Sequence, residues 1–449
     1  MKRKIYNELL RWKQEEQGHC ALLIDGARRV GKSYIVREFA QQEYRSALVI
    51  DFSVARKEVK QLFAEYAGDI DLLFMNLTSI YNVTLYRRES LIVFDEVQEC
   101  PLARQAIKHL VADGRYDYIE TGSLVSINRN VKDIIIPSEE RRMSLYPMDF
   151  EEFLWAVGNE TLMDYIRQRY ERREPMHLLH RKAMEYLRQY MLVGGMPQAV
   201  QEFTETKDLV RVDRVKRDII ALYKADISKY ATGHESRVGG IFDQIPSQLQ
   251  RHERRFKLSS VEKGGRMRDF SSSFFWLSEA MTVNIAYNTT EPNIGLRMRE
   301  DNSMLKCYLS DTGLLLSMAF DDGTIVREEL YRKLLLDKLE VNAGMLFENL
   351  VAQMLRAAGH KLYFYSNNSR GDLSDRMEID FLITKPTITS RHNISPIEVK
   401  SGNRYTTGSL RKMIGKYGNY LATPYVVHSA DLSEKEGVVL LPIYMVPLL

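Results

Sequence analysis

Short runs of consecutive apolar residues alternate with helix-like segments through the first third of the chain. Four of these runs read as strands: ALLIDG (21–26), ALVIDF (47–52), LIVFDE (91–96) and YDYIET (116–121). Strands without polar alternation are typical of a parallel sheet that helices cover on both faces. After the first run, Val36, Phe39 and Ala40 recur at helical spacing. The pattern predicts a doubly wound α/β domain over residues 1–135, opened by a short amphipathic helix within residues 1–20.

The middle of the chain has a different pattern. Residues 136–235 contain helical segments interrupted at GGMP (194–197), and they predict an all-helical lid region. Residues 236–330 predict two helices followed by a β-hairpin, which is the order of a winged helix. The segments expected to be helical are 149–157, 180–193, 241–250 and 270–281, and those expected to form the hairpin are 281–288 and 305–311.

Residues 331–449 predict a second, smaller α/β domain. A long helical stretch at 341–359 precedes strand-like segments, and a further helix at 409–418 lies before the last of them. The strand-like segments are 361–366, 378–384, 395–401 and 423–429.

The composition is that of a folded protein with several domains. The chain has 449 residues, of which 45% are hydrophobic, so wholesale disorder is excluded and about three domains are expected. A net charge of +3 excludes polycationic coat proteins and acidic tail proteins, but it allows local basic grooves. Cys20, Cys100 and Cys307 have neither disulfide-framework nor zinc-site spacing, which favours a reducing compartment. Without a signal-like or membrane-spanning apolar segment, we expect a cytoplasmic protein.

The segment GARRVGKS fits the phosphate-binding pattern G-x-x-x-x-G-K-[ST], between a buried strand and an amphipathic helix. Its glycines let backbone N–H groups face one point, where the helix N-terminus also favours an anion. Lys32 supplies a full positive charge for the β- and γ-phosphates, and Ser33 supplies a hydroxyl ligand for Mg²⁺. The predicted nucleotide-binding residues are Gly26, Ala27, Arg28, Arg29, Val30, Gly31, Lys32 and Ser33.

A pair of carboxylates lies where such a domain needs one. Asp95 and Glu96 end a buried strand, and ligands of open α/β sheets bind at the carboxyl ends of strands. Asp95 is expected to hold Mg²⁺ together with Ser33, and Glu96 to orient or deprotonate the attacking water. In YIETGS (118–123), either Thr121 or Ser123 is a candidate for the polar residue between phosphate and water.

The sequence does not single out an arginine finger. Arg28 and Arg29 lie inside the phosphate-binding loop, and Arg141 and Arg142 follow the predicted sheet domain. Basic segments at 251–256 and 264–270 lie near the predicted winged helix, where they are compatible either with DNA binding or with an ordinary solvated rim.

A second group of acidic residues lies near the C-terminus. In EIDFLI and PIEVKSG, alternation along two strands places Asp380, Glu398 and Lys400 on one surface if the strands pair, and Glu348 on the preceding helix can join them. Carboxylates beside a lysine suit Mg²⁺ and the activation of water, as in restriction-endonuclease-like enzymes. The sequence therefore offers a second metal site at these four residues, or simply a charged outer face of a sheet.

Many motifs occur together in order, among them GARRVGKS, LIVFDEVQECP, IETGSL, LYPMDFEEFLWA, VGGMPQAV, LSDTGLL, GMLFENLVAQML, EIDFLI and IEVKSG. The chain thereby resembles prokaryotic AAA-type P-loop ATPases with a C-terminal domain of unknown function. The resemblance spans about residues 5–445. It implies an AAA-type P-loop NTPase sheet domain, a helical lid, a winged-helix-like region and a restriction-endonuclease-like α/β domain. It also implies ATP binding in the phosphate-binding loop and nuclease-like positions for Glu348, Asp380, Glu398 and Lys400.

One segment departs from this family. Where related sequences often carry Gly-Arg after the sheet domain, this chain has SEERRM (138–143), so a nucleotide-sensing role for Arg141 or Arg142 does not follow. Three functions stay open. The main hypothesis is an ATP-hydrolysing switch, with Mg²⁺, whose C-terminal domains contact DNA or a protein partner. The alternatives are an ATP-regulated nuclease and a nucleotide-gated DNA-binding module with negligible turnover. A homo-oligomer is also open.

Overall fold

The computed structural model describes residues 1–66, 68–123, 137–251, 255–320, 328–329, 331, 333, 343–367, 375–385, 387, 389, 391–402 and 405–449. The chain forms two compact units, Met1–Tyr146 and Pro147–Leu449. The predicted domain limits at 135, 136 and 330, and residues 252–254 of the basic segment, lie outside the described residues. Among the described residues, no helix combines the length and the apolar character needed to cross a membrane.

The N-terminal unit is built on a five-stranded sheet in the order β2-β3-β4-β1-β5, in which every pairing is parallel. The strands are β1 (Ala21–Gly26), β2 (Ser46–Asp51), β3 (Ser90–Asp95), β4 (Asp117–Gly122) and β5 (Glu140–Leu145). The helices are α1 (Ile5–Glu16), α2 (Lys32–Glu43), α3 (Lys57–Glu65), α4 (Ile70–Tyr81) and α5 (Pro101–Asp113), with a 3₁₀ turn, η1 (Val97–Glu99), between β3 and α5. The predicted parallel α/β fold is confirmed.

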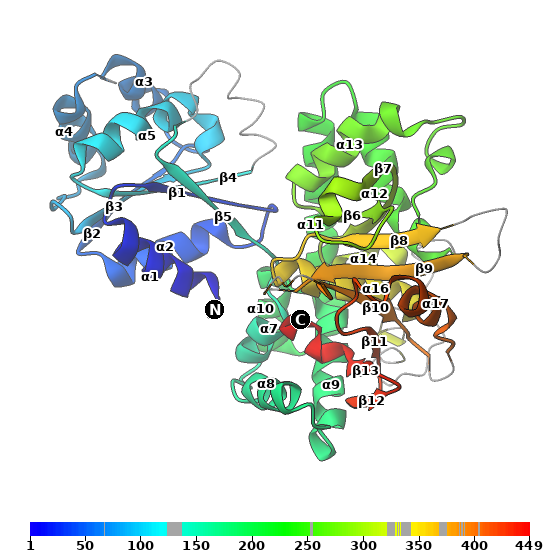
Figure 1. Cartoon of the computed structure of the whole chain (residues 1–449). Coiled ribbons are helices and arrows are strands. Elements are labelled where there is room, and N and C mark those ends of the chain that lie inside the picture. Colours follow the sequence, from blue (N-terminus) through cyan, green and yellow to red (C-terminus); the bar gives the residue numbers. More distant parts are fainter. Residues whose placement is uncertain are drawn as a thin grey trace. The chain divides into compact units, whose positions relative to one another are not determined.

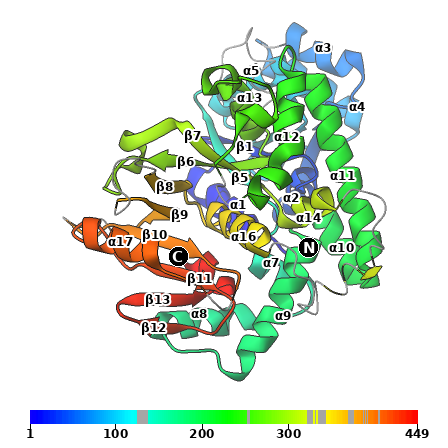
Figure 2. The same ribbon diagram turned by 90° about the vertical axis from the view of Figure 1, so that its right-hand side faces the viewer.

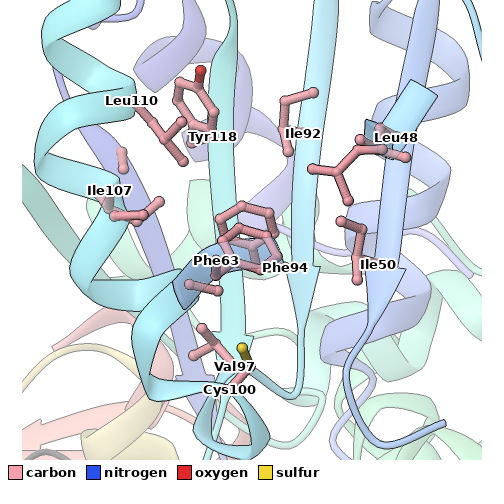
Figure 3. Close-up of a cluster of buried hydrophobic side chains, with 14 of the residues drawn as sticks. Leu48, Ile50, Phe63, Ile92, Phe94, Val97, Cys100, Ile107, Leu110 and Tyr118 are labelled. Atoms are coloured by element: carbon pink, nitrogen blue, oxygen red, sulfur yellow. The ribbon is translucent and has the colours of Figure 1, made fainter. Parts of the chain in front are cut away.

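Helices cover both faces of this sheet, as the continuous apolar strands predict (Figure 1). On one face, α1 and α2 bury Trp12 and Phe39 against Ile24 and Val93. On the other face, α3, α4 and α5 surround a cluster that includes Phe63, Phe94 and Tyr118 (Figure 3). Burying each large apolar side chain stabilises the fold by about 1.5–3 kcal/mol relative to leaving it exposed. These two layers fix the carboxyl ends of the strands, where the candidate site lies.

Strand β5 was not expected, because its sequence ERRMSL falls where the pattern predicts a loop and then helices. It pairs with β1 along its full length and forms one edge of the sheet. An edge strand is partly exposed and can carry charged side chains, so it lacks the apolar run that identifies the central strands.

The C-terminal unit begins with helices, as the pattern predicts. They are α7 (Phe150–Ala156), α8 (Leu162–Arg172), α9 (Leu178–Val193), α10 (Pro197–Thr206), α11 (Leu209–Tyr230), α12 (Glu235–Gln250) and α13 (Met267–Glu279). A 3₁₀ turn, η2 (Leu258–Ser260), lies between α12 and α13, and a second, η3 (Leu296–Arg299), precedes β7. Asp149 caps α7 in a capping box with Glu152, which explains why that helix starts where it does. The predicted hairpin follows α13 as the antiparallel pair β6 (Val283–Thr289) and β7 (Glu300–Leu309).

This hairpin belongs to a larger sheet. Eight strands pair in the order β12-β13-β11-β10-β9-β8-β6-β7, and β6 pairs in parallel with β8. The remaining elements are α14 (Thr312–Ala319), α16 (Ala343–Ala357), β8 (Tyr363–Asn367), β9 (Met377–Thr384), β10 (Ile394–Val399), α17 (Gly408–Tyr417), β11 (Tyr425–His428), β12 (Ser433–Lys435), β13 (Val438–Pro442) and η4 (Ile443–Leu448). One sheet thus joins two regions that the sequence pattern treats as separate. The winged-helix-like and restriction-endonuclease-like descriptions stay predictions.

Helix α16 packs on β6, β7 and β10 of this sheet (Figure 2). Of the second group of candidate residues, Glu348 is on this helix, and Asp380 and Glu398 are on strands β9 and β10. Cys20, Cys100 and Cys307 are free thiols, as their spacing predicts.

Candidate functional site: the phosphate-binding loop and a carboxylate cluster

The loop between β1 and α2 has the backbone geometry that its glycines predict. Gly31, directly before α2, has φ +98°, a left-handed conformation that glycine adopts without strain. A Cβ on Gly26 would lie 2.5 Å from the carbonyl oxygen of Leu145 on β5, so a larger residue does not fit there. The two glycines therefore let the loop fold back over the helix N-terminus.

Lys32 is the first residue of α2, and its side chain is buried. Its Nζ donates to the carbonyl oxygens of Gly26 at 2.9 Å and Ala27 at 3.2 Å. Burial lowers the pKa of Lys32, while the nearby carboxylates of Glu96, Asp25 and Asp95 act in the opposite direction. An ammonium held by carbonyl groups rather than by a full counter-charge is well suited to an anionic ligand.

The other residues of the loop have different surroundings. Ala27 and Val30 are buried, and the carbonyl oxygen of Val30 accepts a hydrogen bond from Arg3 at 3.1 Å. Arg28 and Arg29 are exposed, and Arg29 has φ +68°. The loop is therefore held by its apolar residues and by backbone contacts, while its two arginines face solvent.

Asp95, at the end of β3, joins three elements. Its Oδ1 accepts hydrogen bonds from Ser33 Oγ at 2.8 Å and from Thr121 Oγ1 at 2.5 Å. Its Oδ2 lies 3.3 Å from the guanidinium of Arg37 on α2. The carboxylate is buried, so these donors satisfy a charge that is removed from water. The structure thus brings together Ser33, Asp95 and Thr121, as the motifs predict.

Glu96 follows directly in a left-handed conformation with φ +54°. Its backbone N–H donates to Thr121 Oγ1 at 3.3 Å, and its Oε2 accepts from Gln98 Nε2 at 2.5 Å. Of the two candidates in YIETGS, Thr121 is buried and contacts Asp95, whereas Ser123 is half-buried at the last described position before 124–136. The geometry favours Thr121 over Ser123.

Arg141 and Arg142 lie on β5, within the sheet rather than after it, and they contact acidic residues of the same unit. Arg142 Nε donates to Asp25 Oδ2 at 2.8 Å, and Asp25 directly precedes the phosphate-binding loop. Arg141 forms an ion pair with Glu16 on α1. These ion pairs join β5 to β1 and α1.

The C-terminal candidates divide into two groups. Glu348 on α16 and Asp380 on β9 both lie near Lys306 Nζ of β7, at 3.4 Å and 3.6 Å. Glu398, by contrast, pairs with Lys400 at 3.2 Å and accepts the backbone N–H of Leu410 at 3.2 Å.

The two groups are linked through the paired strands. Asp380 Oδ2 accepts the backbone N–H of Val399 at 2.8 Å, as the antiparallel pairing of β9 with β10 allows. Burial raises the pKa of Glu398 to about 6, with a further contribution from Asp380 and an opposing one from Lys400. Among the described residues, no three His, Cys, Asp or Glu side chains group closely enough to hold a metal ion.

Sequence reasoning missed Arg37, Lys306 and Tyr308. Arg37 follows Ser33 by one helical turn, and this i, i+4 spacing was a usable signal that both side chains face Asp95. Lys306 is a lysine in the buried, mostly apolar second half of β7, but its partners are about 40 or more residues further along the chain. No local pattern connects it to them.

Three family models match separate parts of the chain. Residues 19–154 match the model of an AAA domain. Residues 184–324 and 343–446 match two domains of unknown function, DUF8612 and DUF4143. No curated protein matches the chain.

Solved structures with some similarity include the Walker-type ATPase PABY2304 of Pyrococcus abyssi, at 15% identity over 71% of this chain and 95% of that one, with a TM-score of 0.39. The Aeropyrum pernix ORC1 protein in complex with DNA shares 12% identity over 73% of this chain and 95% of that one, with a TM-score of 0.29. With TM-scores this low, the assignment depends on the AAA-domain match and the geometry of the loop. The N-terminal unit is an AAA-type P-loop domain, and it is followed by two domains of unknown function.

Proposed function

We propose that the N-terminal unit binds and hydrolyses ATP and acts as a switch for the C-terminal unit. The observation that carries this proposal is the convergence of Ser33 and Thr121 on one oxygen of Asp95, beside the buried Lys32. These groups come from the start of α2 and the ends of β3 and β4. They lie at the carboxyl edge of a parallel sheet, where ligands of such sheets bind.

Lys32 is the main ligand for the triphosphate. Its present acceptors are two backbone carbonyl groups, which a phosphate oxygen replaces with a stronger, charge-assisted contact. The amides at the start of α2 add a partial positive charge at the same point. The phosphate-binding loop therefore accepts a polyphosphate without rearranging its apolar support.

Ser33 and Asp95 fit a magnesium ion. A hydroxyl and a carboxylate are oxygen donors of the kind that Mg²⁺ prefers, and their present hydrogen bond brings the two oxygens to 2.8 Å. When bound, Mg²⁺ neutralises charge on the phosphates. Thr121 keeps its hydrogen bond to Asp95 and so holds the carboxylate in place.

Glu96 is the residue that we assign to the attacking water. Its backbone N–H contacts Thr121, and its carboxylate contacts Gln98, so both ends are oriented. A carboxylate fixed beside the phosphate-binding loop can accept a proton from water as it attacks. Because Thr121 contacts both acidic residues, a change at the γ-phosphate reaches β4.

The test is ATP binding and hydrolysis by the full chain and by Lys32→Ala. We expect Lys32→Ala to weaken binding of a non-hydrolysable ATP analogue with Mg²⁺ in calorimetry, and to reduce turnover by about 10²–10³-fold. Lys57→Ala, at an exposed lysine that begins α3, is the matched control and should behave like wild type. Unchanged binding and hydrolysis in folded Lys32→Ala would refute the proposal.

DNA is the partner class that we favour for the C-terminal unit. The exposed side of α13 carries Arg268, Ser271, Ser272 and Phe275, and Arg266 is exposed directly before this helix. Exposed arginines and serines on a helix that packs on strand β6 of a hairpin suit a groove of DNA. Affinity for duplex DNA that falls with salt, and falls further in Arg266→Ala and Arg268→Ala, would support it. If the affinity for DNA changes neither with salt nor in these variants, a protein is the remaining candidate partner.

A further inference from the structure

The carboxylates of the C-terminal unit already surround a cation that belongs to the chain itself. The ammonium of Lys306, on β7, lies 2.9 Å from Glu378 Oε1, 3.4 Å from Glu348 Oε1 and 3.6 Å from Asp380 Oδ1. The carboxylates come from two different elements, α16 and β9. The ammonium donates a hydrogen bond to Glu348 and forms ion pairs with Glu378 and Asp380.

Lys306 and Glu348 are removed from water, while the other two carboxylates of this group are partly exposed. The side chains of Lys306 and Glu348 are 1% and 0% exposed, that of Asp380 is 17% exposed and that of Glu378 is 35% exposed. Tyr308, two residues along β7, donates its hydroxyl to Glu348 Oε1 at 2.5 Å, and the ring of Phe364 lies 5.0 Å from the ammonium. A buried ammonium is stable only with counter-charges, and buried carboxylates likewise need a cation. In this cluster the ammonium of Lys306 and the carboxylates satisfy each other.

The fold explains why a lysine reaches this position. Strand β7 is an edge strand of the eight-stranded sheet, and α16 packs on β6, β7 and β10. Glu348 is on α16, so the stem of Lys306 runs between the helix and the sheet before its ammonium meets the acidic residues.

We propose that the ammonium of Lys306 is the resident cation of this cluster, in the place where the predicted nuclease-like site would hold Mg²⁺. Two of the predicted metal ligands, Glu348 and Asp380, are engaged by Lys306 instead. Magnesium needs near-octahedral oxygen coordination with waters, and the buried ammonium excludes it. The unmodified protein therefore holds no divalent cation here and does not perform metal-dependent cleavage through these residues. This inference is independent of the proposed ATPase.

The experiment removes the lysine and measures whether a metal ion then binds to the carboxylates. Manganese binding to the nucleotide-free full chain is measured by calorimetry and electron paramagnetic resonance for wild type and Lys306→Met, a neutral change of similar length. We expect Lys306→Met to gain one Mn²⁺ per chain, bound at least tenfold more tightly than by wild type, and the double variant Lys306→Met/Glu348→Gln to lose it. Lys400→Met, which removes the neighbouring lysine, is the matched control and should gain no site.

Two results would overturn the proposal. The first is stoichiometric Mn²⁺ binding by wild type that disappears in Asp380→Asn, and the second is folded Lys306→Met that binds no more Mn²⁺ than wild type. If Lys306→Met does not fold, the folding of the double variant Lys306→Met/Glu348→Gln, measured by circular dichroism, tests the proposal instead. Removal of both Lys306 and the Glu348 charge should restore folding, and a double variant that is as unfolded as the single one would contradict the assignment.

Discussion

Lys32 in the phosphate-binding loop and Lys306 in the C-terminal cluster are both buried lysines near several acidic residues, but they differ in what they touch. Lys32 donates to the carbonyl groups of Gly26 and Ala27. Burial lowers its pKa and the acidic residues near it oppose this shift, but none of them forms an ion pair with it among the described contacts. Lys306 lies within 3.6 Å of three carboxylates. The first ammonium is available to an anion, and the second is already neutralised.

The comparison teaches that a lysine among carboxylates does not by itself mark a site of chemistry. What decides is whether the charge is held by weak acceptors that a ligand can replace, or by charged partners that a ligand must outcompete. Lys32 sits on a loop at the carboxyl edge of a sheet, whereas Lys306 sits within a strand under a helix. The same residue type thus prepares a binding site in one unit and stabilises the core of the other.

The largest effect that we expect concerns the stability of the C-terminal unit. Lys306→Met leaves Glu348 buried without its cation, and loss of one member of a buried pair costs about 3–5 kcal/mol. Lys400→Met should cost less, because the side chain of Lys400 is 25% exposed and its buried partner Glu398 keeps the hydrogen bond from the backbone N–H of Leu410. Urea unfolding of both variants measures the difference, and equal losses would erase the contrast between the two lysines.

The next effect separates binding from hydrolysis in the N-terminal unit. Glu96→Gln removes the acceptor for the proton of water but leaves Lys32 and Ser33 intact, so turnover should fall by about 100-fold while ATP affinity changes little. Glu99→Gln, at an exposed carboxylate three residues further along, is the control. Steady-state hydrolysis and calorimetry report the two quantities. Equal turnover in the two variants would remove Glu96 from the mechanism.

A smaller effect distinguishes the two polar residues after β4. Thr121→Val removes the hydroxyl that donates to Asp95, so turnover should fall by about tenfold, the value of one hydrogen bond to a charged group. Thr121→Ser keeps the hydroxyl and should recover most of the rate. If Ser123→Ala lowers turnover more than Thr121→Val does, the sensing residue is Ser123 instead.

The last effect is a pH dependence in the C-terminal unit. Burial raises the pKa of Glu398 to about 6, above the ordinary value of 4.5 for glutamate. The folded protein therefore binds this proton more tightly than the unfolded chain does, and stability is lost as pH rises from about 4.5 to 6, by up to about 2 kcal/mol. Glu398→Gln has no such proton, so its free energy of unfolding should rise relative to wild type across this interval. Parallel curves for the two proteins would contradict the assignment.

Local patterns predicted a good part of this molecule. The apolar runs around Ile24 and Val93 identified the central parallel strands, because strands buried on both faces lack polar alternation. The spacing of Gly26, Gly31 and Lys32 identified the phosphate-binding loop, because the backbone there needs glycine and the helix start needs a ligand-facing cation. The hairpin β6–β7 and helix α16 were also visible from sequence.

What only the tertiary structure decided depends on contacts between distant residues. The charged strand β5 forms because β1 offers it a free edge, and β6 joins the C-terminal sheet because β8 pairs with it. Lys306 becomes the partner of Glu348 and Asp380 because strands and a helix far apart in the chain enclose one buried space. Periodicity identifies which face of an element is buried, but it does not identify which charged side chain of another element contacts that face.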